Sequence, residues 1–410
     1  MNNNEILKKY AHLAVKIGVN IQQHQTLVIS SPIECANFTR LIAETAYEEG
    51  AKDVVINWND ELFSKIRFLK APEEVFEEIP NWQKEFYLSY AVSGAAFLSI
   101  FASDPENLKG VDPKKIAKAQ KTRGTALREY SERLMSNKNT WSIISIPTKA
   151  WAKKVFPDVN EEEAVEKLWD SIFKIVRVDK EDPVAAWEKH KKSLKKGMDF
   201  LNSNNFKFLH YNNSLGTDLK IELPKDHLWL GGADYTPDGI EFIANIPTEE
   251  VFTLPLKTGV NGTVVSSKPL NCNGNLVENF SITFKHGRIV DFKADKGYEA
   301  LKNIIETDEG SHYLGEVALV PFDSPISNSN IIFYNTLYDE NASCHLAIGK
   351  AYPVCLKNGE NMNELELAEC GVNTSLVHED FMVGTKDLNI TGICEDGKET
   401  PVFIHGNWAF

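Results

Sequence analysis

Short apolar runs alternate with long amphipathic segments over the first 180 residues, and this alternation most constrains the fold. In the stretch 160–177, Leu168 and Ile172 fall on one apolar stripe, and Asn160 followed by Glu163 is typical of a helix start. Strands separated by long helical crossovers pair in parallel and are covered on both faces. The sequence therefore predicts helices near 4–19, 38–50, 160–177 and 183–202, and buried strands at 25–30, 53–58, 95–102 and 141–147.

The pattern changes after residue 202, where short alternating stretches with turn residues replace the long helices. The stretches 206–223 and 280–294 are typical of β-hairpins with Asn- or Gly-containing turns, and a helix is expected at 298–307. A chain of 410 residues is long enough for two cores. We expect an α/β protein with an N-terminal α/β domain, mainly a parallel sheet, at residues 1–180, and a β-rich α+β domain at residues 181–410.

Charge and composition exclude several classes of function. The net charge of −14 argues against a nucleic-acid partner, since phosphate binding relies on clustered Lys and Arg. The N-terminus is interrupted by Lys8, Lys9 and Lys16, so it lacks the apolar region of a signal peptide, and no apolar run is long enough to span a membrane. Six dispersed cysteines without a CxxC pair indicate a reduced, cytoplasmic protein. Neither a G-x-G-x-x-G nor a P-loop motif occurs, which makes a nucleotide-dependent dehydrogenase the weakest hypothesis.

Side chains that can ligate metal ions are dense in the β-rich second half. If the segment around His378 is a strand, His378 and Asp380 lie on one face and Glu379 lies on the other. An imidazole and a carboxylate held rigidly two residues apart form part of a metal chelate. For this segment alone, an exposed polar strand edge is the alternative interpretation.

A second segment carries Glu340 and His345, a carboxylate and an imidazole five residues apart. If the stretch after His345 is helical, Tyr352 lies on the same face as His345. A buried His–Tyr core pair is the alternative interpretation. Cys344 could also ligate zinc, but nothing else here is rich in thiolates, so its neighbour His345 is the better candidate.

Two further segments contribute carboxylates. Glu249 and Glu250 follow Pro247, where a solvated acidic pair at the start of a helix is the ordinary interpretation. Glu316 heads the apolar strand-like run 315–320, and a buried carboxylate at that position needs a partner because an unpaired buried charge is very costly. A divalent cation is one such partner.

The order and spacing of these segments resemble the aminopeptidase T-type family of metallo-aminopeptidases, also called thermophilic metallopeptidases. The resemblance covers essentially the whole chain and is carried by NIPTEEVFT (245–253), GEVALV (315–320), LYDENASCHLAIGKAY (337–352) and HEDFMVG (378–384). It implies two divalent metal ions, Zn²⁺, Co²⁺, Mn²⁺ or Mg²⁺, in the second domain. The implied ligands are Glu250, Glu316, Glu340, His345, His378 and Asp380, with Glu316 bridging the ions and Tyr352 in the same site as a ligand or hydroxyl donor. Glu316 and Tyr352 are the expected catalytic residues.

The resemblance also implies a function. We expect a cytoplasmic, homodimeric enzyme that removes N-terminal residues from peptides with a free N-terminus, by attack of a metal-activated water on the first peptide bond. A carboxypeptidase or amidohydrolase with a similar dinuclear site is the nearest alternative. A non-enzymatic metal-dependent binding module is an alternative from another class.

Overall fold

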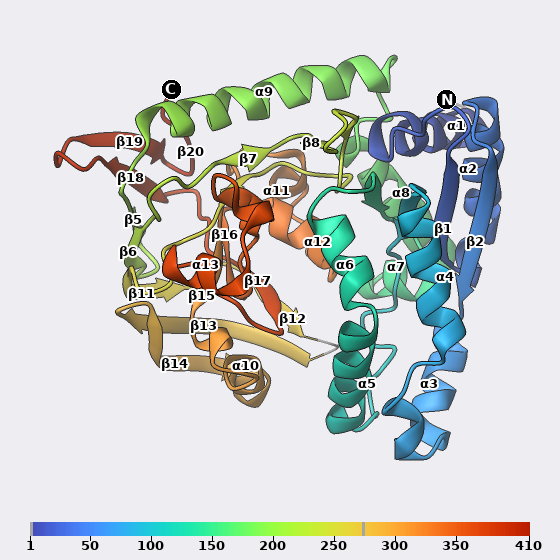
Figure 1. Cartoon of the computed structure of the whole chain (residues 1–410), viewed down its shortest axis with the longest axis horizontal. Helices are drawn as coiled ribbons and strands as arrows, with labels where there is room; N and C mark the ends of the chain where they lie inside the picture. Colours follow the sequence, from blue (N-terminus) through green and yellow to red (C-terminus); the bar gives the residue numbers. More distant parts are fainter. Residues whose placement is uncertain (1–2, 273–274) are drawn as a thin grey trace. The chain divides into compact units, whose positions relative to one another are not determined.

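The computed structural model describes residues 3–272 and 275–410 (Figure 1). These residues divide into two compact units. Unit 1 comprises residues up to Lys189 together with Ala233–Pro247, and unit 2 comprises His190–Gly232 and Thr248–Phe410. The sequence prediction assigned residues 233–247 to the second domain, whereas here this segment groups with unit 1. No helix among the described residues is long and apolar enough to cross a membrane.

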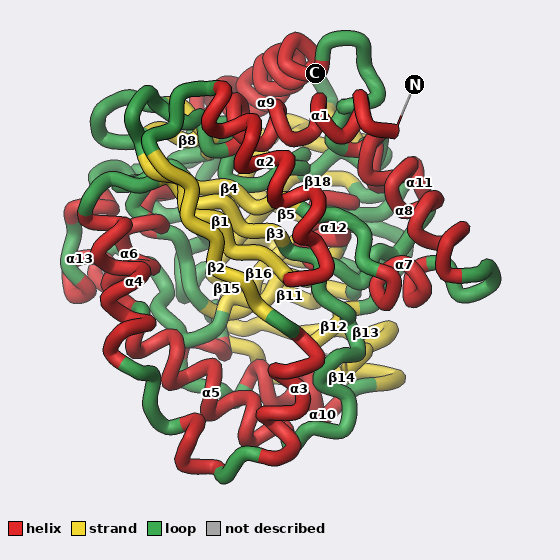
Figure 2. Tube along the Cα trace, turned by 90° about the vertical axis from the view of Figure 1, so that its right-hand side faces the viewer, coloured by secondary structure: helices red, strands yellow, loops and turns green. Residues whose placement is uncertain are grey.

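Unit 1 is built on a parallel sheet with the strand order β2-β1-β3-β4. The strands are β1 (Thr26–Pro32), β2 (Asp53–Asn59), β3 (Ala96–Ile100) and β4 (Trp141–Ile144), and they run side by side in Figure 2. The helices are α1 (Asn3–Leu13), α2 (Ala36–Glu48), α3 (Glu61–Lys70), α4 (Asn81–Val92), α5 (Pro113–Ala126), α6 (Arg128–Met135), α7 (Lys149–Val155) and α8 (Glu161–Ile175). All four predicted strands and their parallel pairing are confirmed.

Alternating side chains explain why this sheet is buried on both faces. Val28 and Phe97 pack against Ala91 of α4, with Tyr130 of α6 beside them. Leu27 and Ile29, the neighbours of Val28, are also buried, and successive strand residues point to opposite faces. The predicted cap of α8 is confirmed as well, because the Asn160 side chain accepts a hydrogen bond of 2.9 Å from the Glu163 backbone N–H.

Unit 2 contains two antiparallel sheets. The smaller has the order β17-β16-β15-β10-β7, with strands β7 (Leu230–Gly231), β10 (Val251–Thr253), β15 (Leu314–Leu319), β16 (His345–Gly349) and β17 (His378–Met382). The larger has the order β12-β13-β11-β6-β5-β18-β19-β20, with β14 paired to β13. Its strands are β5 (Phe208–Asn212), β6 (Asp218–Glu222), β11 (Val260–Val265), β12 (Leu270–Cys272), β13 (Asn275–Lys285), β14 (Arg288–Lys296), β18 (Asn389–Ile393), β19 (Glu399–Ile404) and β20 (Asn407–Trp408). The predicted hairpins are the β5–β6 and β13–β14 pairs.

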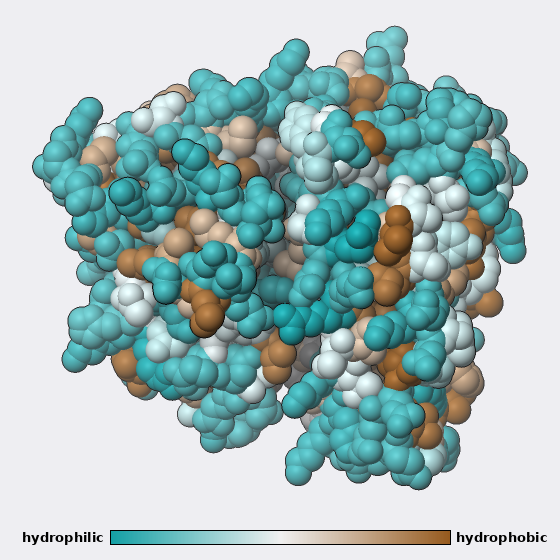
Figure 3. Space-filling view, viewed as in Figure 1, coloured by the Kyte–Doolittle hydropathy of each residue, from teal (hydrophilic) through white to brown (hydrophobic). Residues whose placement is uncertain are grey.

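The core of unit 2 lies between these sheets. Val317, Leu346 and Phe381 of the smaller sheet join one buried cluster with Leu209 and Ile221 of the larger sheet. The helices connected with this unit are α9 (Pro183–Asn204), α10 (Tyr298–Ile305), α11 (Pro325–Ser329), α12 (Thr336–Asp339) and α13 (Glu364–Glu369), and α9 passes from unit 1 into unit 2. Figure 3 shows that hydrophilic side chains cover most of the face in view.

Candidate metal centre

One face of the smaller sheet in unit 2 carries the polar side chains that the sequence singled out. Glu316 of β15 lies opposite Ala347 of β16, which in turn lies opposite Asp380 of β17, so the two carboxylates share one row across three strands. His345 and His378 occur at the same parity on their strands and therefore share this face. The opposite face packs into the core of unit 2, which makes the strands a rigid support.

Small residues surround these polar groups. Ala318 and Ala347 lie on the same face, and Gly349 lies opposite His378. A Cβ on Gly349 would lie 2.2 Å from the Val377 carbonyl oxygen, and the backbone has φ of 105°, which favours glycine. Space for ligand side chains and a bound ion therefore comes from residues that contribute almost no side chain of their own.

Two groups of metal-competent atoms meet at Glu316. Glu250, Glu316 and His345 form one triad, and Glu316, His378 and Asp380 form the other; within each triad the ligand atoms lie within 4.8 Å of one another. The oxygens of Glu316 face different imidazoles, with Oε1 at 3.7 Å from His345 Nε2 and Oε2 at 3.3 Å from His378 Nε2. His345 Nε2 also lies 3.0 Å from Glu250 Oε2, and His378 Nε2 lies 3.4 Å from Asp380 Oδ1. One carboxylate thus serves both triads.

The remaining ring nitrogen of each histidine is held by a backbone carbonyl. His345 Nδ1 lies 3.1 Å from the Ser343 carbonyl oxygen, and His378 Nδ1 lies 2.7 Å from the Lys350 carbonyl oxygen. A carbonyl can only accept, so Nδ1 carries the hydrogen in both rings. In the neutral imidazole, Nε2 then offers its lone pair to the carboxylate-lined space, which is the usual arrangement of metal-ligating histidines.

The charges of this cluster are strongly coupled. Burial lowers the pKa of His345, but hydrogen bonds to Glu250 and Glu316 outweigh burial and raise the pKa well above its ordinary value. The pKa of His378 is also raised, because Tyr352, Asp380 and Glu316 outweigh burial. Burial raises the pKa of Glu316, yet hydrogen bonds from both imidazoles lower it to about 2. The carboxylates therefore favour a positive charge beside them, which a protonated imidazole or a bound cation can supply.

Glu340 joins the same cluster from a short turn that runs from Glu340 to Ala342. Burial raises the pKa of Glu340 well above its ordinary value, and the charges of Asp380 and Glu250 raise it further. Burial and the charges of Glu316 and Asp380 also leave the pKa of Glu250 raised. Within the described residues, the buried Oδ1 of Asp380 accepts no hydrogen bond. Clustered carboxylates, an unsatisfied carboxylate oxygen and two oriented imidazoles fit divalent cations bound by oxygen and nitrogen.

Tyr352 reaches the cluster by a route that differs from the predicted one. A helix after His345 is wrong, because residues 345–349 form β16, paired on both sides with β15 and β17. A short apolar run cannot be assigned to helix or strand from periodicity alone. The ring of Tyr352 nevertheless packs on that of His378, with 4.8 Å between centroids, and lies 6.2 Å from that of Phe252.

The alternative of a solvated Glu249–Glu250 pair at a helix start is also wrong. Both side chains are buried, and the segment leads into β10. Glu249 Oε2 lies 3.6 Å from His190 Nε2, a histidine that no sequence pattern singled out. On the far face of β17, Glu379 accepts a hydrogen bond from the Cys272 thiol at 3.8 Å, so the predicted alternation around His378 and Asp380 is confirmed.

Comparison with known proteins places this geometry in a family. The family model described as thermophilic metalloprotease (M29) matches residues 3–408. The chain belongs to the thermophilic metalloprotease (M29) family. The sequence of this M29 protein is 54% identical to Aminopeptidase 2 of Geobacillus stearothermophilus and 52% identical to Aminopeptidase AmpS of Bacillus subtilis (strain 168), over 98% of each chain. The solved structure of wild-type AmpT from Thermus thermophilus matches 99% of the chain and 100% of its own length, with a TM-score of 0.93 and 40% identity.

These findings confirm the resemblance that the four sequence motifs carried, and they confirm the mixed α/β fold. Membership of a metalloprotease family also implies a divalent metal ion in this M29 protein. The structure brings all seven predicted site residues into one region of unit 2, five of them in the two triads, with Glu340 and Tyr352 beside them.

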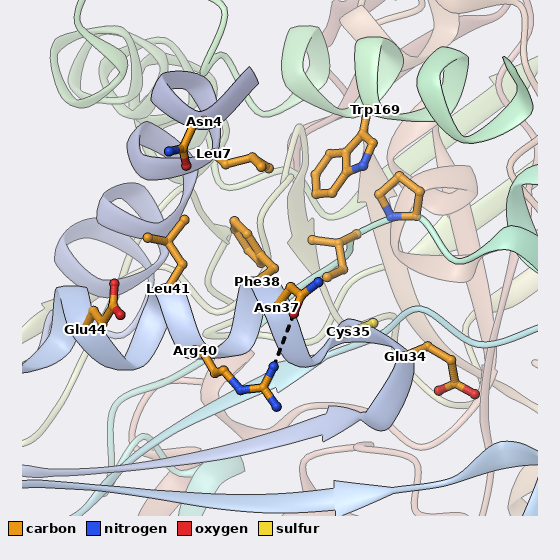
Figure 4. Close-up of a pocket in the computed structure, with 12 residues that line it drawn as sticks. Asn4, Leu7, Glu34, Cys35, Asn37, Phe38, Arg40, Leu41, Glu44 and Trp169 are labelled. Carbon is orange, nitrogen blue, oxygen red and sulfur yellow. Dashed lines mark hydrogen bonds between the residues drawn. The ribbon is translucent and has the colours of Figure 1, made fainter. Parts of the chain in front are cut away.

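A groove in unit 1 bears on the dehydrogenase alternative. It has a cavity volume of about 380 Å³ and lies between α1, α2 and α8, where Glu34 and Cys35 follow β1 and Pro147 follows β4 (Figure 4). Nucleotides bind at the carboxyl ends of strands in such sheets, on a glycine-rich turn. The groove is lined by Arg40 and by the carboxylates of Glu34 and Glu44, but the turn after β1 contains no glycine, so the glycine-rich turn of dinucleotide-binding sites is missing there.

Proposed function

We propose that the protein is a metallo-aminopeptidase that holds two divalent cations on the smaller sheet of unit 2. The observation that carries the proposal is Glu316, whose two oxygens face the imidazoles of two triads. The peptidase class rests on membership of the metalloprotease family and on full-length similarity to proteins named as aminopeptidases.

The residues that would hold the cations are Glu250, Glu316, Glu340, His345, His378 and Asp380. Four of them are carboxylates, so two divalent cations would balance their charge when the imidazoles are neutral. Burying this many carboxylates without such a partner is costly. The donors are carboxylates and imidazoles without a thiolate, which suits Zn²⁺, Co²⁺, Mn²⁺ or Mg²⁺. When bound, the cations would activate a water, polarise the first peptide carbonyl and ligate the free α-amine of the substrate.

Tyr352 is the proposed hydrogen-bond donor to the oxygen that becomes negative during attack on the peptide carbonyl. The charge of His378 lowers the pKa of Tyr352, but burial and the carboxylates of Glu316 and Asp380 outweigh it and raise that pKa above its ordinary value. The hydroxyl therefore keeps its proton at neutral pH and can donate. Donors aimed at a developing oxyanion usually contribute strongly to catalysis.

The proposal also places the protein in the reducing cytoplasm, and the state of its cysteines supports this location. None of the six cysteines forms a disulfide, and four of them are buried. Structural disulfides are rare in that compartment. The homodimer remains a proposal that rests on the resemblance to the family.

The test is hydrolysis of aminoacyl-nitroanilides by the purified chain, before and after chelation and after add-back of single divalent metals. Activity should vanish with chelator and return with at least one metal, and N-acetylated substrates should resist cleavage. His378→Ala should lose both activity and bound metal. Near-normal activity with unchanged metal content in that variant would refute the site, and preferential cleavage of N-blocked substrates would favour a carboxypeptidase or amidohydrolase.

A further inference from the structure

The proposed ligands are held in place by two different kinds of support. Glu316, His345, His378 and Asp380 belong to strands that are fixed by backbone pairing. Glu250 precedes β10, and Glu340 lies in the turn Glu340–Ala342, so ladder hydrogen bonds do not position either carboxylate directly. Their charges repel each other, so some other contact must hold these two segments together.

One side chain joins the two segments. Asn341 is 0% exposed, and its Oδ1 accepts a hydrogen bond of 2.7 Å from the Glu249 backbone N–H. Its Nδ2 donates to Glu340 Oε1 at 3.3 Å and to the Leu337 carbonyl oxygen at 3.1 Å. Glu249 is the direct neighbour of Glu250, and it is 92 residues from Asn341 in sequence.

The contacts of this amide determine its orientation. The acceptor faces a backbone N–H, while the two N–H donors face a carboxylate and a carbonyl, so the reversed amide would place like groups against each other. A fully buried amide is costly unless its polar atoms are paired. Asp339 fixes the same turn from the other side by accepting backbone hydrogen bonds from Phe333 at 2.8 Å and Asn335 at 3.1 Å.

We propose that Asn341 is a positioning residue, which holds the Glu250 and Glu340 carboxylates at the separation that cation binding needs. The inference rests on the proposed function, because it assigns Asn341 a role toward the cations of that site. Asn341 donates directly to one proposed ligand and orients the other through the peptide N–H of Glu249. Residues that orient metal ligands in this way typically contribute ~10- to 100-fold in metal affinity.

The chain offers a matched control for the loss of a buried amide. Asn139 of unit 1 is 2% exposed, and its Nδ2 donates to the carbonyl oxygens of Ala91 and Ala95, both at 2.9 Å. Like Asn341, it is a buried amide whose Nδ2 donates to backbone carbonyl oxygen, but it contacts none of the proposed ligands. Variants of Asn139 therefore measure how much stability is lost with a buried amide when no proposed ligand is affected.

The experiment compares Asn341→Ala and Asn341→Asp with Asn139→Ala and Asn139→Asp in the full chain. Zn²⁺ affinity is measured on metal-free protein by competition with a chromogenic chelator, and thermal unfolding of the same samples reports folding. Both Asn341 variants should bind Zn²⁺ ~10- to 100-fold more weakly than the wild type. Both Asn139 variants should lose about as much thermal stability as the Asn341 variants, but they should bind Zn²⁺ as tightly as the wild type does.

Asn341→Asp keeps the size of the side chain and an acceptor for Glu249, so it tests the proposal even if the alanine variant does not fold. Because Asn341 lies behind the ligands, excess Zn²⁺ should restore kcat toward the wild-type value while KM stays unchanged. Folded Asn341 variants with wild-type affinity, or an equal loss of affinity in the Asn139 variants, would overturn the positioning role while the proposed function stands. Failure of the wild-type chain to bind any of Zn²⁺, Co²⁺, Mn²⁺ and Mg²⁺ would overturn the proposed function and this inference together.

Discussion

Glu316 is the single residue on which both triads depend. Each of its oxygens lies within 4 Å of a different imidazole nitrogen, at 3.7 Å and 3.3 Å, and the side chain is 6% exposed. Hydrogen bonds from both imidazoles lower its pKa to about 2, which favours the ionised carboxylate at neutral pH. A carboxylate that is charged at neutral pH and offers two separate oxygens is suited to bridge two cations.

Glu316→Gln tests this at the residue scale. Glutamine keeps the size of the side chain, but it removes the charge and turns an N–H donor toward one of the imidazoles. We expect kcat/KM to fall by at least ~100-fold and the number of bound cations per chain to decrease. Metal content is measured by mass spectrometry of the desalted protein, beside hydrolysis of an aminoacyl-nitroanilide. Glu306→Gln, at an exposed position after α10, is the control that should change neither quantity, and a fully metallated, active Glu316→Gln enzyme would contradict the bridging role.

Much of this site could be predicted from local sequence, and the exceptions have physical causes. The pairing of His378 with Asp380 follows from strand alternation, which depends only on neighbouring residues. The burial of Glu249 does not, because it results from contacts with His190 and Asn341 that are distant in sequence. For the same reason Asn341 gave no signal, since an asparagine in a turn is ordinarily explained by turn geometry.

At the scale of elements, the four strands β10, β15, β16 and β17 create the site by alternating apolar and polar or small side chains. Periodicity and turn residues predicted the strands of unit 1 and the hairpins of unit 2, because both signals are local. They could not predict the order β17-β16-β15-β10-β7, in which strands distant in the chain become neighbours. Nor could they distinguish β16 from a short helix, since the apolar run after His345 is too short to show a period.

Gly349→Ala tests the geometry of this sheet where the backbone of Gly349 lies close to the chain before His378. Its added methyl group would lie 2.2 Å from the Val377 carbonyl oxygen, so the chain before His378 must move. Gly397 also has a positive φ, 84°, but no atom lies within 4 Å of the position that an added methyl group would take there, so Gly397→Ala carries the conformational cost alone. That shared cost is about 1–2 kcal/mol. We expect Gly349→Ala to lose more thermal stability than Gly397→Ala and, unlike that control, to lose Zn²⁺ affinity. Equal stability and equal Zn²⁺ affinity of the two variants would show that His378 tolerates the displacement.

For the whole molecule, the net charge is −14, and most acidic side chains are exposed, whereas those of the proposed metal site are buried or half-buried. Surface carboxylates are solvated and cost little. The buried ones need either protons or cations, and the two compete for the same atoms, because a metal ligand must be deprotonated. The stability of the protein should therefore depend on pH in opposite directions with and without bound metal.

The sign follows from the raised pKa values. In the metal-free protein, His345 and His378 bind protons more tightly when folded than when unfolded, so their contribution to stability is present at low pH and is lost as the pH rises through their raised pKa values. Cation binding needs both imidazoles neutral and Glu340 ionised. Because the pKa of Glu340 is raised as well, protons compete with the cation for all three side chains. Zn²⁺ affinity should therefore keep rising with pH above the ordinary histidine pKa of about 6.5.

Calorimetric titrations in two buffers of different ionisation enthalpy measure the number of protons released when Zn²⁺ binds. Thermal unfolding from pH 6 to 9 should show that the metal-free protein loses stability while the metal-loaded protein gains it. If Zn²⁺ affinity levels off near the ordinary histidine pKa, and no protons are released above that pH, then cation binding does not displace protons from these imidazoles.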